Sequence, residues 1–112
     1  MTRQKSTTIL KGTLELLILR TLELEPRHGV GVADRIAQTT DGTFVVGAGS
    51  LFPALHRLEE RELIRGEWRE TSEGRRAKFY ALTLAGRRQL DREKKTWARI
   101  VWAMNQLLTP NS

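Results

Sequence analysis

The hydrophobic periodicity of this 112-residue chain changes near residue 63, and few folds accommodate that change. Upstream of this point, apolar residues recur three and four positions apart, which is the spacing of one helix face. Downstream, residues 63–70 and 77–82 are strand-like and flank a polar loop, residues 71–76, that contains one glycine. Two strand-like runs around such a loop are typical of a β-hairpin. A helical pattern then resumes, so we predict a mainly α fold with a small β-hairpin.

The apolar spacing and the helix-ending residues predict four helices. They are a first helix with Leu14–Leu22 that ends before Pro26, a second from His28-Gly29 to about Thr39, a third over Gly49–Glu62, and a fourth that Thr83 caps and that continues to Leu108. Ser50 is a suitable N-cap for the third helix, and Pro53 then falls in the first turn, where its missing N–H costs little. Asp41-Gly42 predicts a turn, and Thr43–Val46 predicts a short strand. Three helices with a two-stranded wing form the simplest architecture that uses every piece.

The composition narrows the class of function. The chain has 19 Lys and Arg residues against 13 Asp and Glu, a net charge of +6, which favours an anionic partner and nucleic acid above all. A hydrophobic fraction of 39% in 112 residues indicates one globular domain. The apolar runs are far shorter than the roughly 20 residues of a membrane span, and the basic start lacks the apolar region of a secretory leader. We therefore expect a cytoplasmic protein.

Signals of catalysis and of metal binding are missing from the sequence. There is no cysteine, which excludes disulfides, thiolate zinc sites and thiol nucleophiles. His28 and His56 are the only histidines, and no set of Asp, Glu and His residues shows metal-ligand spacing. No glycine-rich phosphate loop or nucleophile motif is present. We expect a protein that is not an enzyme and that needs neither a metal nor a cofactor.

The third predicted helix, Gly49–Glu62, is the candidate recognition helix. Helical spacing assigns its residues to two sides: Leu51, Phe52, Leu55 and Leu58 to the core, and Ser50, Pro53, His56 and Arg57 to the outer face. A helix of this width fits the major groove of DNA, where basic side chains reach base edges and phosphates. An ordinary amphipathic helix with a solvated face has the same pattern, so the case depends on the hairpin that follows.

That hairpin concentrates positive charge. Arg75, Arg76 and Lys78 lie in its loop and outgoing strand, and Arg69 lies on the incoming strand. Residues 75–95 hold eight Lys and Arg against two acidic residues, a net +6 that equals the charge of the whole chain. Basic residues at a hairpin tip are well placed to contact a phosphate backbone or a minor groove. A basic wing beside a candidate recognition helix favours DNA binding.

The last predicted helix carries an apolar stripe that its own chain is too small to cover. The stripe and its neighbours are Trp97, Ile100, Val101, Trp102, Met104, Leu107 and Leu108. The first helix likewise has Leu16, Leu19 and Leu24 outside its main apolar face. Apolar patches of this kind usually mark an interface, so we predict a homodimer built from these two helices.

Four segments in this order resemble the PadR family of bacterial transcriptional regulators. They are Lys11-Gly12-Thr13-Leu14, His28-Gly29, Gly49–Glu59 and Arg75–Thr83, within a similarity over residues 9–108. The resemblance implies a winged helix-turn-helix with one added C-terminal dimerisation helix, as in the short branch of the family. It also implies repression at inverted-repeat operators. The expected division is a flexible N-terminus over 1–8, a DNA-binding domain over 9–83 and a dimerisation helix over 84–112.

The resemblance extends the candidate site. Lys11, Thr13 and His28 belong to its motifs and join the expected DNA contacts. Phe52 departs from the tyrosine that is typical of the family, and we assign it to the core. Some relatives bind planar aromatic effectors between tryptophans, a role open to Trp97 and Trp102, although simple interface packing is the favoured interpretation.

Other functions remain open. The main alternative is a winged-helix module for protein–protein contact whose basic charge is incidental. RNA binding is disfavoured, because only Phe79 and Tyr80 offer bases a stacking surface. The favoured hypothesis is a homodimeric DNA-binding repressor, cytoplasmic and nucleoid-associated when bound, with a small planar effector as a further partner.

Overall fold

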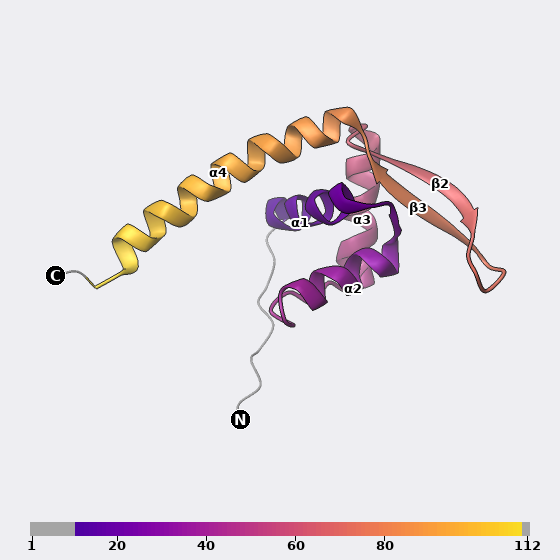
Figure 1. Ribbon diagram of the computed structural model, residues 1–112, viewed down its shortest axis with the longest axis horizontal. Coiled ribbons are helices and arrows are strands. Elements are labelled where there is room, and N and C mark those ends of the chain that lie inside the picture. Colours follow the sequence, from indigo (N-terminus) through magenta and orange to yellow (C-terminus); the bar gives the residue numbers. More distant parts are fainter. Residues whose placement is uncertain (1–10, 111–112) are drawn as a thin grey trace, which may run out of the picture.

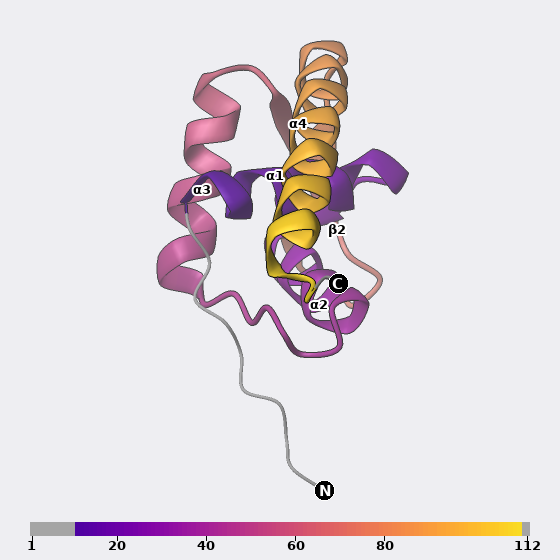
Figure 2. The same cartoon turned by 90° about the vertical axis from the view of Figure 1, so that its left-hand side faces the viewer.

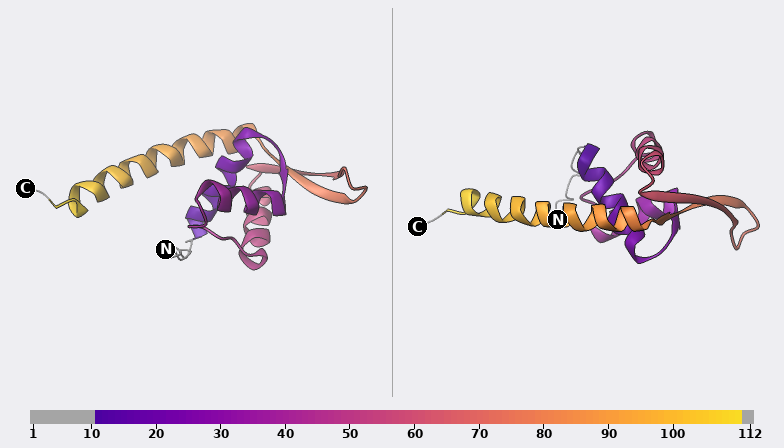
Figure 3. Two further views of the ribbon diagram at one scale, coloured as in Figure 1. Left: turned by 60° about the horizontal axis from the view of Figure 1, so that its bottom comes forward. Right: turned by 90° about the horizontal axis from the view of Figure 1, so that it is seen from above.

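The computed structural model describes residues 11–110, and the expected flexible segment 1–8 lies outside them. Four helices and three strands follow one another in the order α1 (Lys11–Leu24), β1 (Arg27–His28), α2 (Gly29–Thr39), α3 (Ala48–Glu60), β2 (Ile64–Glu70), β3 (Arg76–Leu82) and α4 (Leu84–Leu108). Helices α1, α2 and α3 form a compact body, from which the β2–β3 hairpin and α4 project at opposite ends (Figures 1 and 3). The molecule is therefore long, with extents of 59 × 38 × 22 Å. The predicted mainly α fold with a small hairpin is confirmed.

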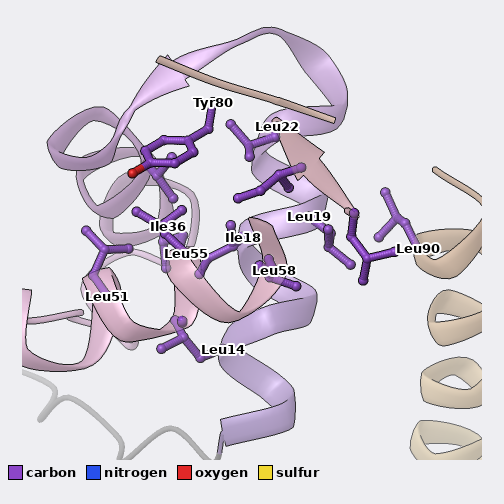
Figure 4. Packing of buried hydrophobic residues seen from close by; sticks show 14 residues of the cluster. Leu14, Ile18, Leu19, Leu22, Ile36, Leu51, Leu55, Leu58, Tyr80 and Leu90 are labelled. Carbon is purple, nitrogen blue, oxygen red and sulfur yellow. The ribbon is translucent and has the colours of Figure 1, made fainter. Parts of the chain in front are cut away.

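One core joins the helices to the base of the sheet (Figure 4). Its fully buried members include Ile18 of α1, Val32 of α2 and both Leu55 and Leu58 of α3. From α4 only Leu90 reaches this core as a buried side chain. The apolar faces of the first three helices are thus covered inside the body, whereas most of α4 extends beyond it (Figure 1). In the view along α4, this helix lies in front of α1 (Figure 2).

The sheet has three strands rather than two, in the order β1-β3-β2. The hairpin pairs antiparallel from Ile64 opposite Leu82 to Glu70 opposite Arg76. The extra strand β1 pairs with the other edge of β3, where His28 lies opposite Phe79. At two residues, β1 is too short to produce an alternating pattern in the sequence.

The predicted strand Thr43–Val46 is wrong. The segment is an irregular connection, in which Phe44 packs against the core while Val45 is 62% exposed. The Thr40 hydroxyl accepts a hydrogen bond from the Phe44 N–H at 3.1 Å, so a side chain takes the place of a strand partner. The predicted turn before it is present, with positive φ angles at Asp41 and Gly42.

Helix α4 is fixed to the body at its first turn. The Thr83 hydroxyl accepts from the Gly86 N–H at 3.0 Å, which confirms the predicted cap, and it donates to the Glu62 carbonyl at 2.7 Å. Gly86 is buried against the carbonyl of Leu63, and a β-carbon at this position would overlap that oxygen. The missing side chain is what allows α4 to lie this close to the start of β2.

Gly86→Ala should therefore destabilise the fold. We expect a loss of about 1–3 kcal/mol in the free energy of unfolding, because the clash is with backbone and outweighs the better helix propensity of alanine. Urea denaturation at one fixed protein concentration measures the change. Gly49→Ala is the control, since a β-carbon there meets nothing within 4 Å. Equal midpoints for the two variants would contradict the close approach.

A second attachment of α4 is the carboxylate of Glu23 on α1. It accepts from Lys94 Nζ at 3.0 Å and pairs with Arg20 at 3.0 Å and with Arg87 at 3.9 Å. The hydrogen bond from Lys94 lowers the pKa of Glu23 below its ordinary value of 4.5, with burial opposing and the positive charges of Lys94, Arg20 and Arg87 adding to the shift. Lys94 and Arg87 both belong to α4, so this cluster joins α1 to α4.

The lowered pKa of Glu23 predicts a pH-dependent contribution to stability. The contribution is fully present above the unfolded value of 4.5 and is lost as the pH falls through the lowered folded value. Glu23→Gln should therefore be less stable than the parent at pH 7, and the gap should narrow in acid. Urea midpoints at pH 7 and below 4.5 measure it, and Lys94→Gln should reproduce the effect. A gap that stays constant with pH would contradict the role of this carboxylate.

Candidate nucleic-acid interface

Helix α3 turns one face toward the core and the opposite face outward. Leu51, Ala54, Leu55 and Leu58 are buried, whereas Ser50, Pro53 and His56 are exposed as expected. The helix begins earlier than expected: Gly47 is the N-cap, and its carbonyl accepts from the Leu51 N–H at 2.9 Å. The assignment of Ser50 as N-cap is therefore wrong. Pro53 consequently lies in the second turn, where its missing N–H leaves the Gly49 carbonyl without a helical donor.

Phe52 is not a core residue, contrary to expectation. Its side chain is 46% exposed, and its ring lies across Gly29 at the start of α2. A β-carbon on Gly29 would come within 2.9 Å of Phe52 Cε1, so the glycine makes room for the ring. Phe52 thus belongs to the outer face of α3. It was assigned to the core because it is apolar.

The basic residues at the end of α3 have partners inside the chain. Arg57 Nε donates to Glu15 Oε2 of α1 at 3.0 Å, and Arg61 donates to the other oxygen of the same carboxylate at 3.2 Å. The expected DNA contact of Arg57 stays a prediction, and in the structure its Nε is engaged by Glu15. Its ion pair with Glu15 stabilises the packing of α3 against α1.

Lys78 is also engaged within the chain. Its Nζ donates to Glu59 Oε1 of α3 at 2.9 Å, which raises the pKa of Lys78, and it lies 5.5 Å from the centre of the Tyr80 ring. Burial raises the pKa of Tyr80 in the same cluster. The expected DNA contact of Lys78 stays a prediction. The Lys78–Glu59 pair holds the hairpin against α3.

The hairpin tip presents the two arginines that the sequence indicated. Gly74, with φ +79°, closes the loop between the strands, and Arg75 and Arg76 are exposed beside it. Neither has an ion-pair partner within residues 11–110. Arg76 lies 5.6 Å over the ring of Trp68, which orients its guanidinium.

One face of the hairpin adds two further arginines. Arg65 and Arg69 of β2 line a shallow hollow with Phe79, and Arg69 lies 5.4 Å over that ring. Arg69 was noted in the sequence, whereas Arg65 was missed. Because the alternation of a strand places residues two apart on one face, their spacing was the available signal.

The residues taken from the N-terminal motifs have other surroundings. His28 caps α2, because its Nδ1 accepts from the Gly31 N–H at 3.0 Å, and its ring packs edge-on against Phe79. The structure gives His28 a structural role, and its expected DNA contact stays a prediction. Thr13 lines a groove between α1 and α4. Lys11 begins α1, and its side chain lies outside what the structure describes.

The apolar stripe of α4 is exposed along its length. Trp97, Val101, Met104 and Leu108 follow helical spacing on one side and are 41–68% exposed, and Trp102 is 66% exposed. Nothing in residues 11–110 covers them. The expected interface residue Leu19 is different: at 1% exposure it belongs to the core of its own chain, so that assignment is wrong.

Comparison with known proteins identifies the class. The family model described as "Transcriptional regulator PadR-like family" matches residues 18–92. The chain belongs to the PadR-like family. Regulators of this family are transcription factors, not enzymes.

Solved PadR-like structures share the fold. A PadR-like transcriptional regulator from Bacillus cereus is 30% identical, with a TM-score of 0.81 over 94% of this chain and 100% of that one. A PadR family regulator from Clostridium difficile is 32% identical, with a TM-score of 0.74 over 85% and 97%. In sequence, a Lysinibacillus sphaericus protein described as uncharacterized protein X is 29% identical over 92 residues, 82% of this chain and 84% of its own. The winged helix-turn-helix is thus the fold of this PadR-like chain.

Two further observations delimit the site of the PadR-like chain. In the described part of the chain, no three acidic residues or histidines are grouped closely enough to hold a metal ion. No helix between residues 11 and 110 is both long and apolar enough for a membrane span. The features that remain are the outer face of α3, the arginine-bearing hairpin and the uncovered stripe of α4.

Proposed function

We propose that this protein is a sequence-specific DNA-binding transcriptional regulator that acts as a homodimer. The observation that carries the proposal is the pairing of an exposed α3 face with an arginine-tipped hairpin, joined by the 2.9 Å Lys78–Glu59 contact. A recognition helix in a major groove places a following wing against the neighbouring backbone. Arg75 and Arg76 would then contact phosphates, while α3 meets base edges. Because bacterial DNA lies in the cytoplasm, the proposal places the protein there.

The dimer is part of the same proposal. The exposed stripe of Trp97, Val101, Met104 and Leu108 is a continuous apolar surface, and such surfaces on a small protein mark interfaces. A twofold dimer through the α4 helices of segment 84–112 would present two 9–83 domains to DNA. An inverted-repeat operator is the site that matches this symmetry, and repression by occupying a promoter is the simplest outcome.

Release by a small planar effector is the remaining element. A groove of about 370 Å³ between α1 and α4 is lined by Thr13, Leu16, Glu93 and Trp97, among others. Within the described residues, Glu93 Oε2 is buried without a hydrogen-bond partner. An indole face beside an unsatisfied carboxylate oxygen is suited to a planar ligand with a hydrogen-bond donor.

Selection of bound sequences from a random DNA duplex pool tests the proposal. The expected result is enrichment of one inverted repeat whose affinity falls steeply with salt, because phosphate contacts release counterions. A pool without enrichment at physiological salt would refute sequence-specific regulation. It would favour the alternative, a winged-helix module for protein contact.

A further inference from the structure

The base-reading face of α3 is poor in free positive charge. Arg57 and Arg61 share the carboxylate of Glu15, and Lys78 is held by Glu59. The two arginines are the side chains that pair best with guanine, through two parallel hydrogen bonds. In this chain one nitrogen of each guanidinium is engaged by the Glu15 carboxylate. Guanine recognition by Arg57 would therefore compete with its ion pair to α1.

The outer face of α3 also carries apolar side chains, beside His56 and the Glu60 carboxylate that lies 3.7 Å from its Nε2. Gly49, Phe52, Pro53 and His56 lie three and four positions apart, so they are neighbours on one side of the helix. All four are exposed. With 100° between successive residues, Pro53 and His56 stand opposite the core, and Phe52 stands at the edge nearest α2. The surface thus consists of the phenyl ring of Phe52 and the pyrrolidine ring of Pro53 beside the imidazole of His56.

This surface is shaped before any partner arrives. The Phe52 ring rests against the backbone of Gly29, which limits the positions open to it. The other edge of the ring is exposed, and a β-carbon on Gly49 would meet nothing within 4 Å. The glycine one turn before Phe52 places no side chain on this part of the surface. A methyl group can therefore approach the exposed part of the ring.

We propose that Phe52 reads thymine through its 5-methyl group, with Pro53 completing the apolar contact. Thymine is the base that presents a methyl group in the major groove, and apolar side chains recognise it there. The inference rests on the proposed DNA binding and gives it a base preference. The wing arginines supply attraction to phosphate, whereas α3 supplies discrimination by shape and apolar contact. The half-sites of the operator should then be rich in A·T pairs.

Deoxyuridine tests this directly, because it is thymidine without the methyl group. Each thymine of the selected site is replaced in turn by deoxyuridine, and Kd is measured by fluorescence anisotropy. We expect about a fourfold weaker Kd at the contacted thymine, which is the effect of losing one buried methyl. With Phe52→Ala, the ratio of the two Kd values at that position should fall to about one. Val45→Ala is the control, since Val45 is also an exposed apolar residue but lies outside α3 and should leave the ratio unchanged.

The outcomes separate the two proposals. If no sequence is enriched, the proposed function is refuted, and the thymine contact, which rests on it, is refuted with it. If a sequence is enriched but every deoxyuridine duplex binds as the parent does, regulation stands and the methyl contact is refuted. An equal ratio in wild type and Phe52→Ala would likewise refute the role of Phe52. The wild-type series needs no variant, so it remains decisive if Phe52→Ala fails to fold.

Discussion

Replacing Val101 and Met104 together by glutamate should convert the proposed dimer into monomers. Both side chains lie on the exposed stripe of α4, at 41% and 48% exposure, so the substitutions leave the core of the chain intact. In a dimer, each glutamate would be buried without a partner, at a cost of several kcal/mol. We expect the dimer dissociation constant to rise by at least about 100-fold. Sedimentation velocity at micromolar concentration measures the change.

The control adds the same two charges on the other side of the helix. Ala103→Glu with Gln106→Glu should leave the dimer intact, because these positions lie away from the stripe. Circular dichroism checks that both variants remain folded. If the Val101 and Met104 variant sediments as the parent does, α4 is not the interface and the symmetry argument for an inverted repeat fails with it.

Reversing the charge of Arg75 and Arg76 should abolish tight DNA binding. These arginines are exposed at the tip of the hairpin, and a charge-assisted contact to phosphate contributes about 1.5–3 kcal/mol. Substituting both with glutamate should weaken Kd by about 100-fold or more. The dependence of log Kd on log salt concentration should also become less steep, by the amount expected for about two lost phosphate contacts. Unfolding free energy should change little, because neither guanidinium has an ion-pair partner in the described chain.

A variant of identical net charge separates local contact from long-range attraction. Arg88→Glu with Arg92→Glu changes two exposed arginines of α4 by the same amount. It should lower affinity only modestly, and less still as salt is raised, since screening removes distant charge effects first. Equal losses in the two variants would show that the hairpin tip is not a contact site. Retained affinity in both would favour a protein-binding module.

Much of the fold could be predicted because its determinants are local. Apolar spacing located all four helices, and Thr83 was identified as the cap of α4 from its position alone. The errors concern structure that depends on distant partners. The segment β1 is a strand because it pairs with β3. Residues Thr43–Val46 are not a strand because no other strand pairs with them. Pairing of this kind leaves no trace in local periodicity.

The internal partners of the candidate site residues could not be predicted, for the same physical reason. Arg57 and Lys78 are basic and near the expected interface, but their carboxylate partners are 42 and 19 residues away in the chain. Sequence proximity cannot reveal such pairs. Phe52 shows the opposite error, because an apolar residue was assigned to the core by default. The exposure of Arg75 and Arg76 could be predicted because it depends only on the hairpin loop, which the sequence indicated.

The attachment of α4 turns it into a lever arm. It is held to the body near Gly86 and Leu90 and, through Lys94, at the Glu23 cluster, and beyond Lys94 it continues for about 21 Å of helix. Over that length, a rotation of about 5° at the attachment moves the far end by about 2 Å. In a dimer joined through the far ends, the same rotation would change the distance between the two reading faces. The spacing of preferred half-sites is then adjustable by substitutions at the fulcrum, with every base-contacting residue left as it is.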